Sequence, residues 1–107
     1  MKKILLVILT LLLVGCTSTP GPYDSFAKCI TSKNVTMYGT SWCVHCQAQK
    51  KLFENSFQYI HFVDCDKNVQ TCVDANVNGY PTWNINNTNY PGELTFYNLS
   101  RLSGCNT

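Results

Sequence analysis

Two cysteines separated by two residues are the first feature of this sequence that suggests chemistry. Cys43-Val44-His45-Cys46 is a Cys-x-x-Cys motif, and thiol–disulfide exchange needs two sulfurs that can bond and one that is a thiolate at the working pH. At the start of a helix, unpaired amide N–H groups and the helix dipole stabilise a thiolate on the first cysteine. We therefore expect Cys43 to be the accessible nucleophile and Cys46 to be the more buried resolving thiol.

The other residues of the motif bear on how it reacts. As an imidazolium, His45 would favour the Cys43 thiolate and a more oxidising couple; the alternative is an exposed helix residue with no tuning role. The two cysteines have alternatives of their own, a structural disulfide or half of a zinc site. Four-cysteine zinc sites usually contain two close pairs, whereas six residues separate Cys65 from Cys72, so we predict no metal site.

The residues around the motif predict a strand, a tight turn and a helix. Val35–Tyr38 is a short β-prone run that ends at Gly39, and Thr40 and Ser41 are candidate caps for a helix that continues through Phe53. This arrangement places the cysteines at a helix N-terminus. Further helices are expected over residues 23–31, with a cap at Asp24 or Ser25, between Cys65 and Cys72, and over 94–102; further strands over 59–63, 81–85 and 90–92, with a hairpin turn at 86–89.

The N-terminal residues have the pattern of an export signal. Lys2 and Lys3 precede an apolar run over residues 4–14, which is too short for a membrane span of about 20 residues. The run ends in Leu-Val-Gly-Cys, which resembles the lipobox of bacterial lipoproteins, in which the cysteine is acylated. We predict a signal peptide over residues 1–15, a lipid on Cys16, a tether through residue 22 and an extracytoplasmic place in the cell envelope. The alternative is an ordinary secretory signal beside a cysteine.

The charge of the exported part excludes some partners. The chain has eight basic and six acidic residues, so without Lys2 and Lys3 the two signs balance at six each. A neutral domain gives no electrostatic reason to expect binding to nucleic acid or to lipid headgroups.

The cysteine count suggests a disulfide framework. Besides Cys16 there are six cysteines, and an even number in a short exported chain is typical of a domain stabilised by disulfides. Six cysteines allow fifteen pairings, and the spacing alone does not choose among them.

Two segments resemble the thioredoxin superfamily: residues 38–50, Tyr-Gly-Thr-Ser-Trp-Cys-Val-His-Cys-Gln-Ala-Gln-Lys, and residues 79–83, Gly-Tyr-Pro-Thr-Trp. From about residue 26 to residue 105 the sequence is most similar to the thioredoxin-like domain fused to bacterial vitamin K epoxide reductase homologues. The resemblance implies an α/β thioredoxin-like fold over residues 23–107, with a central mixed four-stranded sheet flanked by helices.

The resemblance also implies roles for residues outside the motif. Pro81, after Tyr80, matches the proline that is cis in the superfamily and lies against the active-site disulfide, where it helps to hold the substrate backbone; the alternative is a proline that only starts a strand. Trp42 matches the aromatic residue before the motif.

Two further disulfides follow from the same comparison. Cys65 and Cys72 match a second cysteine pair of the fused domain, either a bridge or a relay to the active pair. Cys29 and Cys105 then remain at opposite ends of the domain, and we pair them as a bridge, worth about 4 kcal/mol on the chain-entropy model.

The sequence departs from the family pattern at two positions that influence whether the enzyme oxidises or reduces its substrates. Met37 stands where thioredoxins carry a buried Asp used in proton transfer, and Val44-His45 is nearer to the Pro-His of oxidants than to the Gly-Pro of thioredoxin. The vitamin K epoxide reductase homologue is itself missing, so we expect a separate, quinone-linked membrane oxidoreductase as partner.

Together these features predict an enzyme that exchanges disulfides with protein substrates and uses no cofactor, since its redox group is its own Cys43–Cys46 disulfide. Oxidation is the expected direction, and an envelope reductase or isomerase is the alternative. Two other classes stay open: a copper- or zinc-handling lipoprotein that uses the motif as ligands, and a structural or adhesive lipoprotein.

Overall fold

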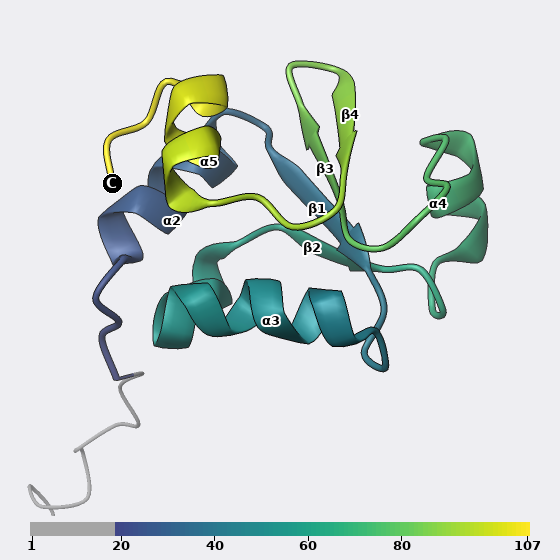
Figure 1. The fold of residues 1–107 in the computed structure, drawn as a ribbon, viewed down its shortest axis with the longest axis horizontal. Helices are drawn as coiled ribbons and strands as arrows, with labels where there is room; N and C mark the ends of the chain where they lie inside the picture. Colours follow the sequence, from purple (N-terminus) through teal and green to yellow (C-terminus); the bar gives the residue numbers. More distant parts are fainter. Residues whose placement is uncertain (1–18) are drawn as a thin grey trace, which may run out of the picture.

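The computed structural model describes residues 19–107. The predicted signal peptide and Cys16 lie outside the described residues. Within residues 19–107 no helix combines the length and the apolar character needed to cross a membrane. In chain order the elements are α2 (Asp24–Ser32), β1 (Thr36–Gly39), α3 (Val44–Phe53), the 3-10 helix η2 (Glu54–Tyr59), β2 (Phe62–Asp64), α4 (Val69–Asp74), β3 (Thr82–Ile85), β4 (Thr88–Pro91) and α5 (Phe96–Ser103) (Figure 1).

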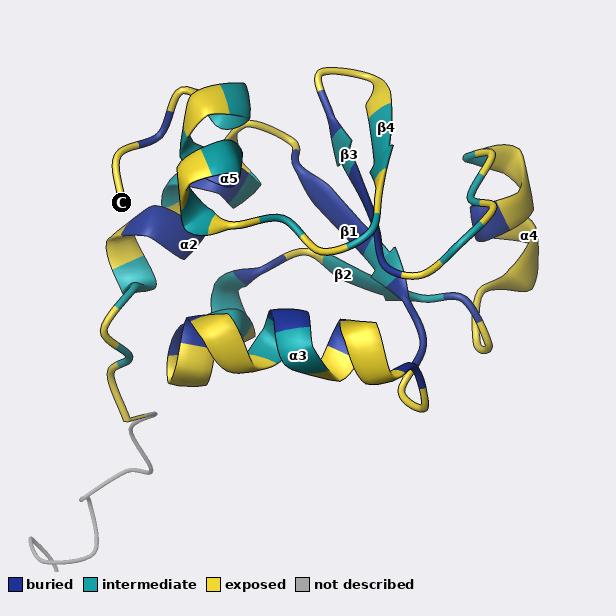
Figure 2. Ribbon diagram, in the orientation of Figure 1, coloured by how far each residue is buried: buried dark blue, intermediate teal, exposed yellow. Residues whose placement is uncertain are grey.

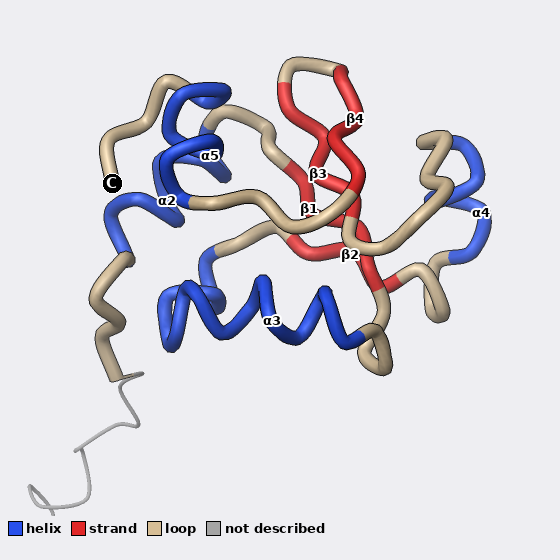
Figure 3. The backbone as a smooth tube through the Cα atoms, viewed as in Figure 1, coloured by secondary structure: helices blue, strands red, loops and turns tan. Residues whose placement is uncertain are grey.

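The strands form one sheet in the order β2-β1-β3-β4. β1 and β2 are parallel because α3 and η2 form the crossover between them, whereas β3 is antiparallel to both β1 and β4. The predicted α/β class, with a mixed four-stranded sheet flanked by helices, is confirmed (Figure 3).

The core is built from aromatic rings contributed by three helices and a strand. Phe53 of α3 lies with its ring centroid 4.8 Å from that of Phe96 in α5 and 6.1 Å from that of Phe26 in α2. Trp83 of β3 lies 6.2 Å from Phe53 and pairs in register with the buried Met37 of β1. Burial of these large rings therefore joins α2, α3 and α5 to the centre of the sheet (Figure 2).

Gln49 is a buried polar residue within this core, on helix α3. Its Oε1 accepts hydrogen bonds from Trp83 Nε1 at 3.0 Å and from the Leu94 amide at 2.7 Å, and its Nε2 donates to the Leu94 carbonyl at 3.0 Å. A buried amide with its partners satisfied avoids the desolvation cost of an unpaired polar group. The side chain thus attaches α3 both to β3 and to the segment before α5.

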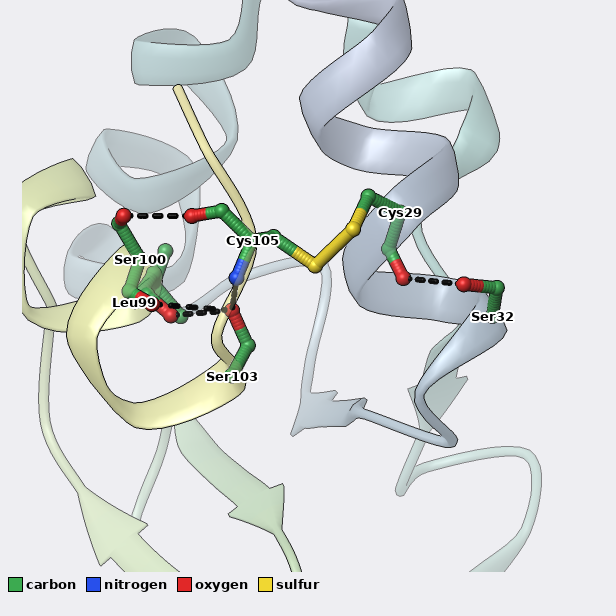
Figure 4. The surroundings of a disulfide bond; sticks show 6 residues. All are labelled: Cys29, Ser32, Leu99, Ser100, Ser103 and Cys105. Atoms are coloured by element: carbon green, nitrogen blue, oxygen red, sulfur yellow. Dashed lines mark hydrogen bonds between the residues drawn. A yellow bond between two sulfur atoms is a disulfide. The ribbon is translucent and has the colours of Figure 1, made fainter.

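The structure pairs Cys29 with Cys105 and Cys65 with Cys72, as expected. The first bridge closes a loop of 76 residues between α2 and the C-terminus. Serine side chains hold its C-terminal end, since the Cys105 amide donates to Ser103 Oγ and Ser100 Oγ donates to the Cys105 carbonyl (Figure 4). The second bridge joins the end of β2 to α4.

Several predicted boundaries were wrong. Neither Asp24 nor Ser25 caps α2: Tyr23 precedes the helix without a side-chain cap. The second strand begins at Phe62, because the residues through Tyr59 form η2. The hairpin needs only Asn86 and Asn87, which have φ of 51° and 62°, so β4 begins two residues earlier than expected.

Asp24 instead fixes the start of the domain. Its carboxylate accepts hydrogen bonds from the Gly21 amide at 3.1 Å and from Ser56 Oγ at 2.8 Å, and Ser56 Oγ accepts from the Tyr23 amide at 2.7 Å. Ser56 is a buried residue of η2, which follows the C-terminal end of α3. The chain therefore enters the domain at that end of α3.

Candidate active site

Cys43 itself caps helix α3, which corrects the expectation that Thr40 or Ser41 would do so. Its backbone is extended, with φ −70° and ψ 121°, and its Sγ accepts a hydrogen bond from the Cys46 amide at 3.2 Å. The sulfur therefore occupies the position of a capping oxygen, where free N–H groups and the helix dipole favour negative charge. This geometry stabilises a thiolate at the first cysteine of the motif.

The two thiols have different surroundings. Both are free and buried, and Cys43 retains the larger exposed fraction, 7% against 0% for Cys46. Burial raises the pKa of Cys46 to about 11, and the hydrogen bond with Cys43 and the charge of Cys43 act in the same direction; the Thr40 amide and Lys50 lower it. Cys46 therefore holds its proton at neutral pH, as expected for the more buried thiol of the pair.

Gly39 provides the space for the Cys46 sulfur. A Cβ at this last residue of β1 would lie 2.7 Å from Cys46 Sγ and 3.2 Å from the Phe62 ring. Such separations are well inside van der Waals contact, so a larger residue would displace the sulfur. The backbone of β1 thus packs directly against the resolving thiol.

The loop before β3 approaches the other thiol. The Tyr80–Pro81 peptide bond is cis, the geometry that the family resemblance implies. The Tyr80 carbonyl accepts a hydrogen bond from Cys43 Sγ at 3.6 Å. Trp42 lies edge-on to Tyr80, with ring centroids 6.1 Å apart at 88°, and its Nε1 donates to Asp66 Oδ2 at 2.8 Å. The structure thus brings together Trp42, Cys43, Tyr80 and Pro81.

His45 is paired with a carboxylate. Its Nδ1 lies 2.8 Å from Glu93 Oε2, and the two side chains are 73% and 38% exposed. When His45 is protonated, Glu93 offsets its positive charge, and an exposed pair of this kind contributes little to stability. Any effect of His45 on the Cys43 thiolate is therefore exerted by the pair rather than by a lone imidazolium.

The two predicted disulfides lie at different places relative to the reacting thiols. The Cys29–Cys105 bridge connects α2 to the C-terminus, whereas the Cys65–Cys72 bridge lies next to β1, since the Cys65 amide donates to the Gly39 carbonyl at 2.8 Å.

Across residues 19–107 no group of three or more His, Cys, Asp or Glu side chains is arranged to hold a metal ion. A hollow of about 510 Å³ contains none of the described cysteines; it is lined by Pro22, Tyr23, Phe96, Tyr97, Ser100 and Thr107.

Sequence reasoning missed four residues that shape this site: Gly39, Gln49, Asp66 and Glu93. Gly39 had a signal, since a glycine directly between the predicted strand and the motif marks a close approach of backbone. Asp66 and Glu93 contact residues 24 and 48 positions away in the chain, and their sequence neighbourhood has no pattern that indicates such contacts.

Comparison with known proteins agrees with this geometry. The thioredoxin family profile matches residues 19–98, most of the chain. The chain belongs to the thioredoxin family. It is 33% identical over 98 residues to thiol-disulfide oxidoreductase LTO1 of Arabidopsis thaliana, an alignment that covers 82% of this chain and 26% of that protein. This thioredoxin-family domain thus spans about a quarter of the length of that relative.

Replacement of Gly39 by Ala tests the contact between β1 and the resolving thiol. We expect the reduced thioredoxin-family domain to lose about 1–3 kcal/mol of unfolding free energy, because the new methyl group overlaps Cys46 Sγ. Urea unfolding of the reduced protein measures this loss. Gly79→Ala is the control, because a Cβ there meets no atom within 4 Å. Equal stability of the two variants would contradict the assignment.

The pH dependence of Cys46 alkylation tests its raised pKa. In a Cys43→Ala variant the hydrogen bond and charge of Cys43 are lost, so the pKa of Cys46 should fall below about 11 but stay above its ordinary value of 9.0, because burial is the largest cause. The labelling rate, followed by mass spectrometry, should rise with the thiolate fraction through this interval. The same variant unfolded in urea is the control, and a folded midpoint at or below 9.0 would be the contrary result.

Proposed function

We propose that this protein is a thiol–disulfide oxidoreductase that exchanges disulfides with other proteins through its Cys-Val-His-Cys motif, in the oxidative direction. The observation that carries the proposal is the position of the Cys43 sulfur, which caps the first turn of α3, the turn that contains the buried Cys46. The similarity to an enzyme named as a thiol-disulfide oxidoreductase supports it.

The oxidative half-reaction begins with the Cys43–Cys46 disulfide. A substrate thiolate attacks Cys43 Sγ, the bond between the two protein sulfurs breaks, and Cys46 leaves with the electron pair and takes up a proton. A second substrate thiolate then attacks the substrate sulfur of the mixed disulfide and releases Cys43 as a thiolate. The substrate loses two electrons and becomes a disulfide, and the enzyme gains them and becomes a dithiol.

The oxidative direction is supported by which redox form of the enzyme the helix stabilises. The N–H groups at the start of α3 stabilise the Cys43 thiolate, which exists only in the reduced enzyme. Stabilising the reduced form makes the corresponding disulfide a stronger oxidant. The helix cap therefore favours transfer of the disulfide from enzyme to substrate.

The proposed place of this reaction is the extracytoplasmic side of the cell envelope, with the domain held by a lipid on Cys16. Two bridges besides the active pair support an oxidising compartment, because such disulfides persist there. Re-oxidation requires an electron acceptor, and we propose a quinone-linked membrane oxidoreductase. The resemblance to the domain fused to vitamin K epoxide reductase homologues supports that class of partner.

Trapping of mixed disulfides tests the nucleophile and the resolving thiol. In a Cys46→Ala variant, the Cys43 thiolate can still attack a substrate disulfide and displace one of its sulfurs, but Cys46 is no longer there to release the adduct, so covalent adducts should accumulate in the cell envelope. Non-reducing electrophoresis followed by mass spectrometry detects them. A Cys43→Ala/Cys46→Ala variant is the matched control and should yield none. Absence of adducts from the single variant would refute the proposal.

The redox state of the motif in cells tests the direction. We expect Cys43 and Cys46 to be mostly oxidised, since an enzyme that oxidises its substrates is in the disulfide form before it meets a reduced substrate. Acid quenching, alkylation of free thiols and peptide mass spectrometry give the ratio of the two forms, with Cys29 and Cys105 as an internal reference for a stable bridge. A mostly reduced motif would show instead that the enzyme works as a reductase or isomerase.

A further inference from the structure

Trp42 is held at two points although most of its surface faces solvent. The side chain is 64% exposed, and it immediately precedes the nucleophile Cys43. Its indole Nε1 donates to Asp66 Oδ2 at 2.8 Å, and its ring meets the edge of the Tyr80 ring at a centroid distance of 6.1 Å. An exposed indole with two fixed contacts has lost most of its rotational freedom before any partner binds.

Both contacts belong to a single segment, residues 65–80, which the Cys65–Cys72 bridge constrains near its start. The bridge closes a loop of seven residues, and the Cys65 amide is bonded to the Gly39 carbonyl at 2.8 Å. The Asp66 amide also donates to Asp64 Oδ1 at 2.9 Å. Asp66 therefore directly follows a bridged cysteine and is hydrogen-bonded back to the last residue of β2, so it has little freedom to move.

The same bridge supports the approach to Tyr80. The Cys72 carbonyl accepts a hydrogen bond from the Val77 amide at 3.1 Å, at the turn that leads from α4 toward Tyr80. Tyr80 in turn accepts the hydrogen bond from Cys43 Sγ. One path of contacts thus leads from the bridge through Asp66 and Trp42 to the residue next to the nucleophile. A second follows the chain from Val77, which is hydrogen-bonded to Cys72, to Tyr80, which is hydrogen-bonded to Cys43.

We propose that Asp66 is a positioning residue for polypeptide substrates, held in place by the Cys65–Cys72 bridge. Asp66 fixes Trp42 against Tyr80, and the two rings form a rigid apolar wall beside Cys43. The wall binds the apolar side chains that flank a substrate cysteine. The Cys65–Cys72 disulfide stays intact during turnover and acts as a support. This inference rests on the proposed oxidoreductase function.

A comparison of a polypeptide with a small dithiol tests the role of Asp66. Oxidised enzyme is mixed with reduced, unfolded ribonuclease or with dithiothreitol, and the single turnover gives a half-saturating concentration and a limiting rate. In Asp66→Ala we expect the half-saturating ribonuclease concentration to rise roughly fivefold, as for loss of one hydrogen bond. The limiting rate and the dithiothreitol rate should stay within about twofold of wild type, because neither depends on the wall.

Two further variants separate positioning from a general structural effect. Asp66→Asn keeps an acceptor for the indole N–H and should restore binding of ribonuclease. Trp42→Phe keeps a ring but removes the donor, so adding Asp66→Ala to it should cause no further change. A fivefold loss that persists in Asp66→Asn, or that adds to Trp42→Phe, would overturn the inference.

The bridge is tested with a matched pair of double variants. Cys65→Ser/Cys72→Ser should show the same rise in half-saturating ribonuclease concentration as Asp66→Ala. Cys29→Ser/Cys105→Ser removes a bridge of longer loop, and thus more stability, but should leave this concentration unchanged. If the first double variant does not fold, the Asp66 series decides alone.

The outcomes separate this inference from the proposed function. Wild-type enzyme that oxidises neither ribonuclease nor dithiothreitol would overturn both. Wild-type enzyme that oxidises ribonuclease, with an unchanged half-saturating concentration in Asp66→Ala, would overturn the role of Asp66 alone. A defect in the bridge variant without one in Asp66→Ala would contradict the positioning role and show that the Cys65–Cys72 pair acts in another way.

Discussion

The side-chain amide of Gln49 joins the helix that bears both reactive cysteines to the rest of the domain. It lies one turn beyond the motif, and its three hydrogen bonds reach Trp83 in the central antiparallel part of the sheet and both backbone groups of Leu94. Removing a partner from such a group would leave buried polar atoms unpaired. Because Leu94 follows Glu93 directly, the same amide also determines where the carboxylate that pairs with His45 can lie.

The site differentiates two chemically identical thiols by what surrounds each sulfur. Cys43 lies at a helix start with an amide directed at its sulfur, whereas Cys46 faces the backbone of Gly39 and the core. The first environment lowers the cost of a negative charge and the second raises it. A displacement of either sulfur would weaken this asymmetry, so the close packing of β1 against α3 is a functional constraint as much as a structural one.

Much of the fold was predictable from local pattern, and most of what was missed depends on contacts between distant residues. Apolar spacing and turn residues indicated the elements, and the motif indicated the reacting thiols. The cap at Cys43 was missed because serine and threonine are the usual capping residues, and both occur just before it. The role of Asp24 was missed because its partner, Ser56, is 32 positions away. Ser56 also belongs to a 3-10 helix that the spacing of apolar residues did not predict. Asp66 and Glu93 were missed for the same reason: their partners are neighbours only after folding.

The attachment of Gly21 and Tyr23 to Asp24 and Ser56 gives the domain a polarity. The chain enters beside the C-terminal end of α3, and the reactive sulfurs lie at the opposite end of that helix, about 15 Å away for ten residues. A large partner can therefore dock on the reactive end without colliding with the segment that leads into the domain. The reactive thiols and the residues by which the chain enters the domain thus occupy opposite ends of α3.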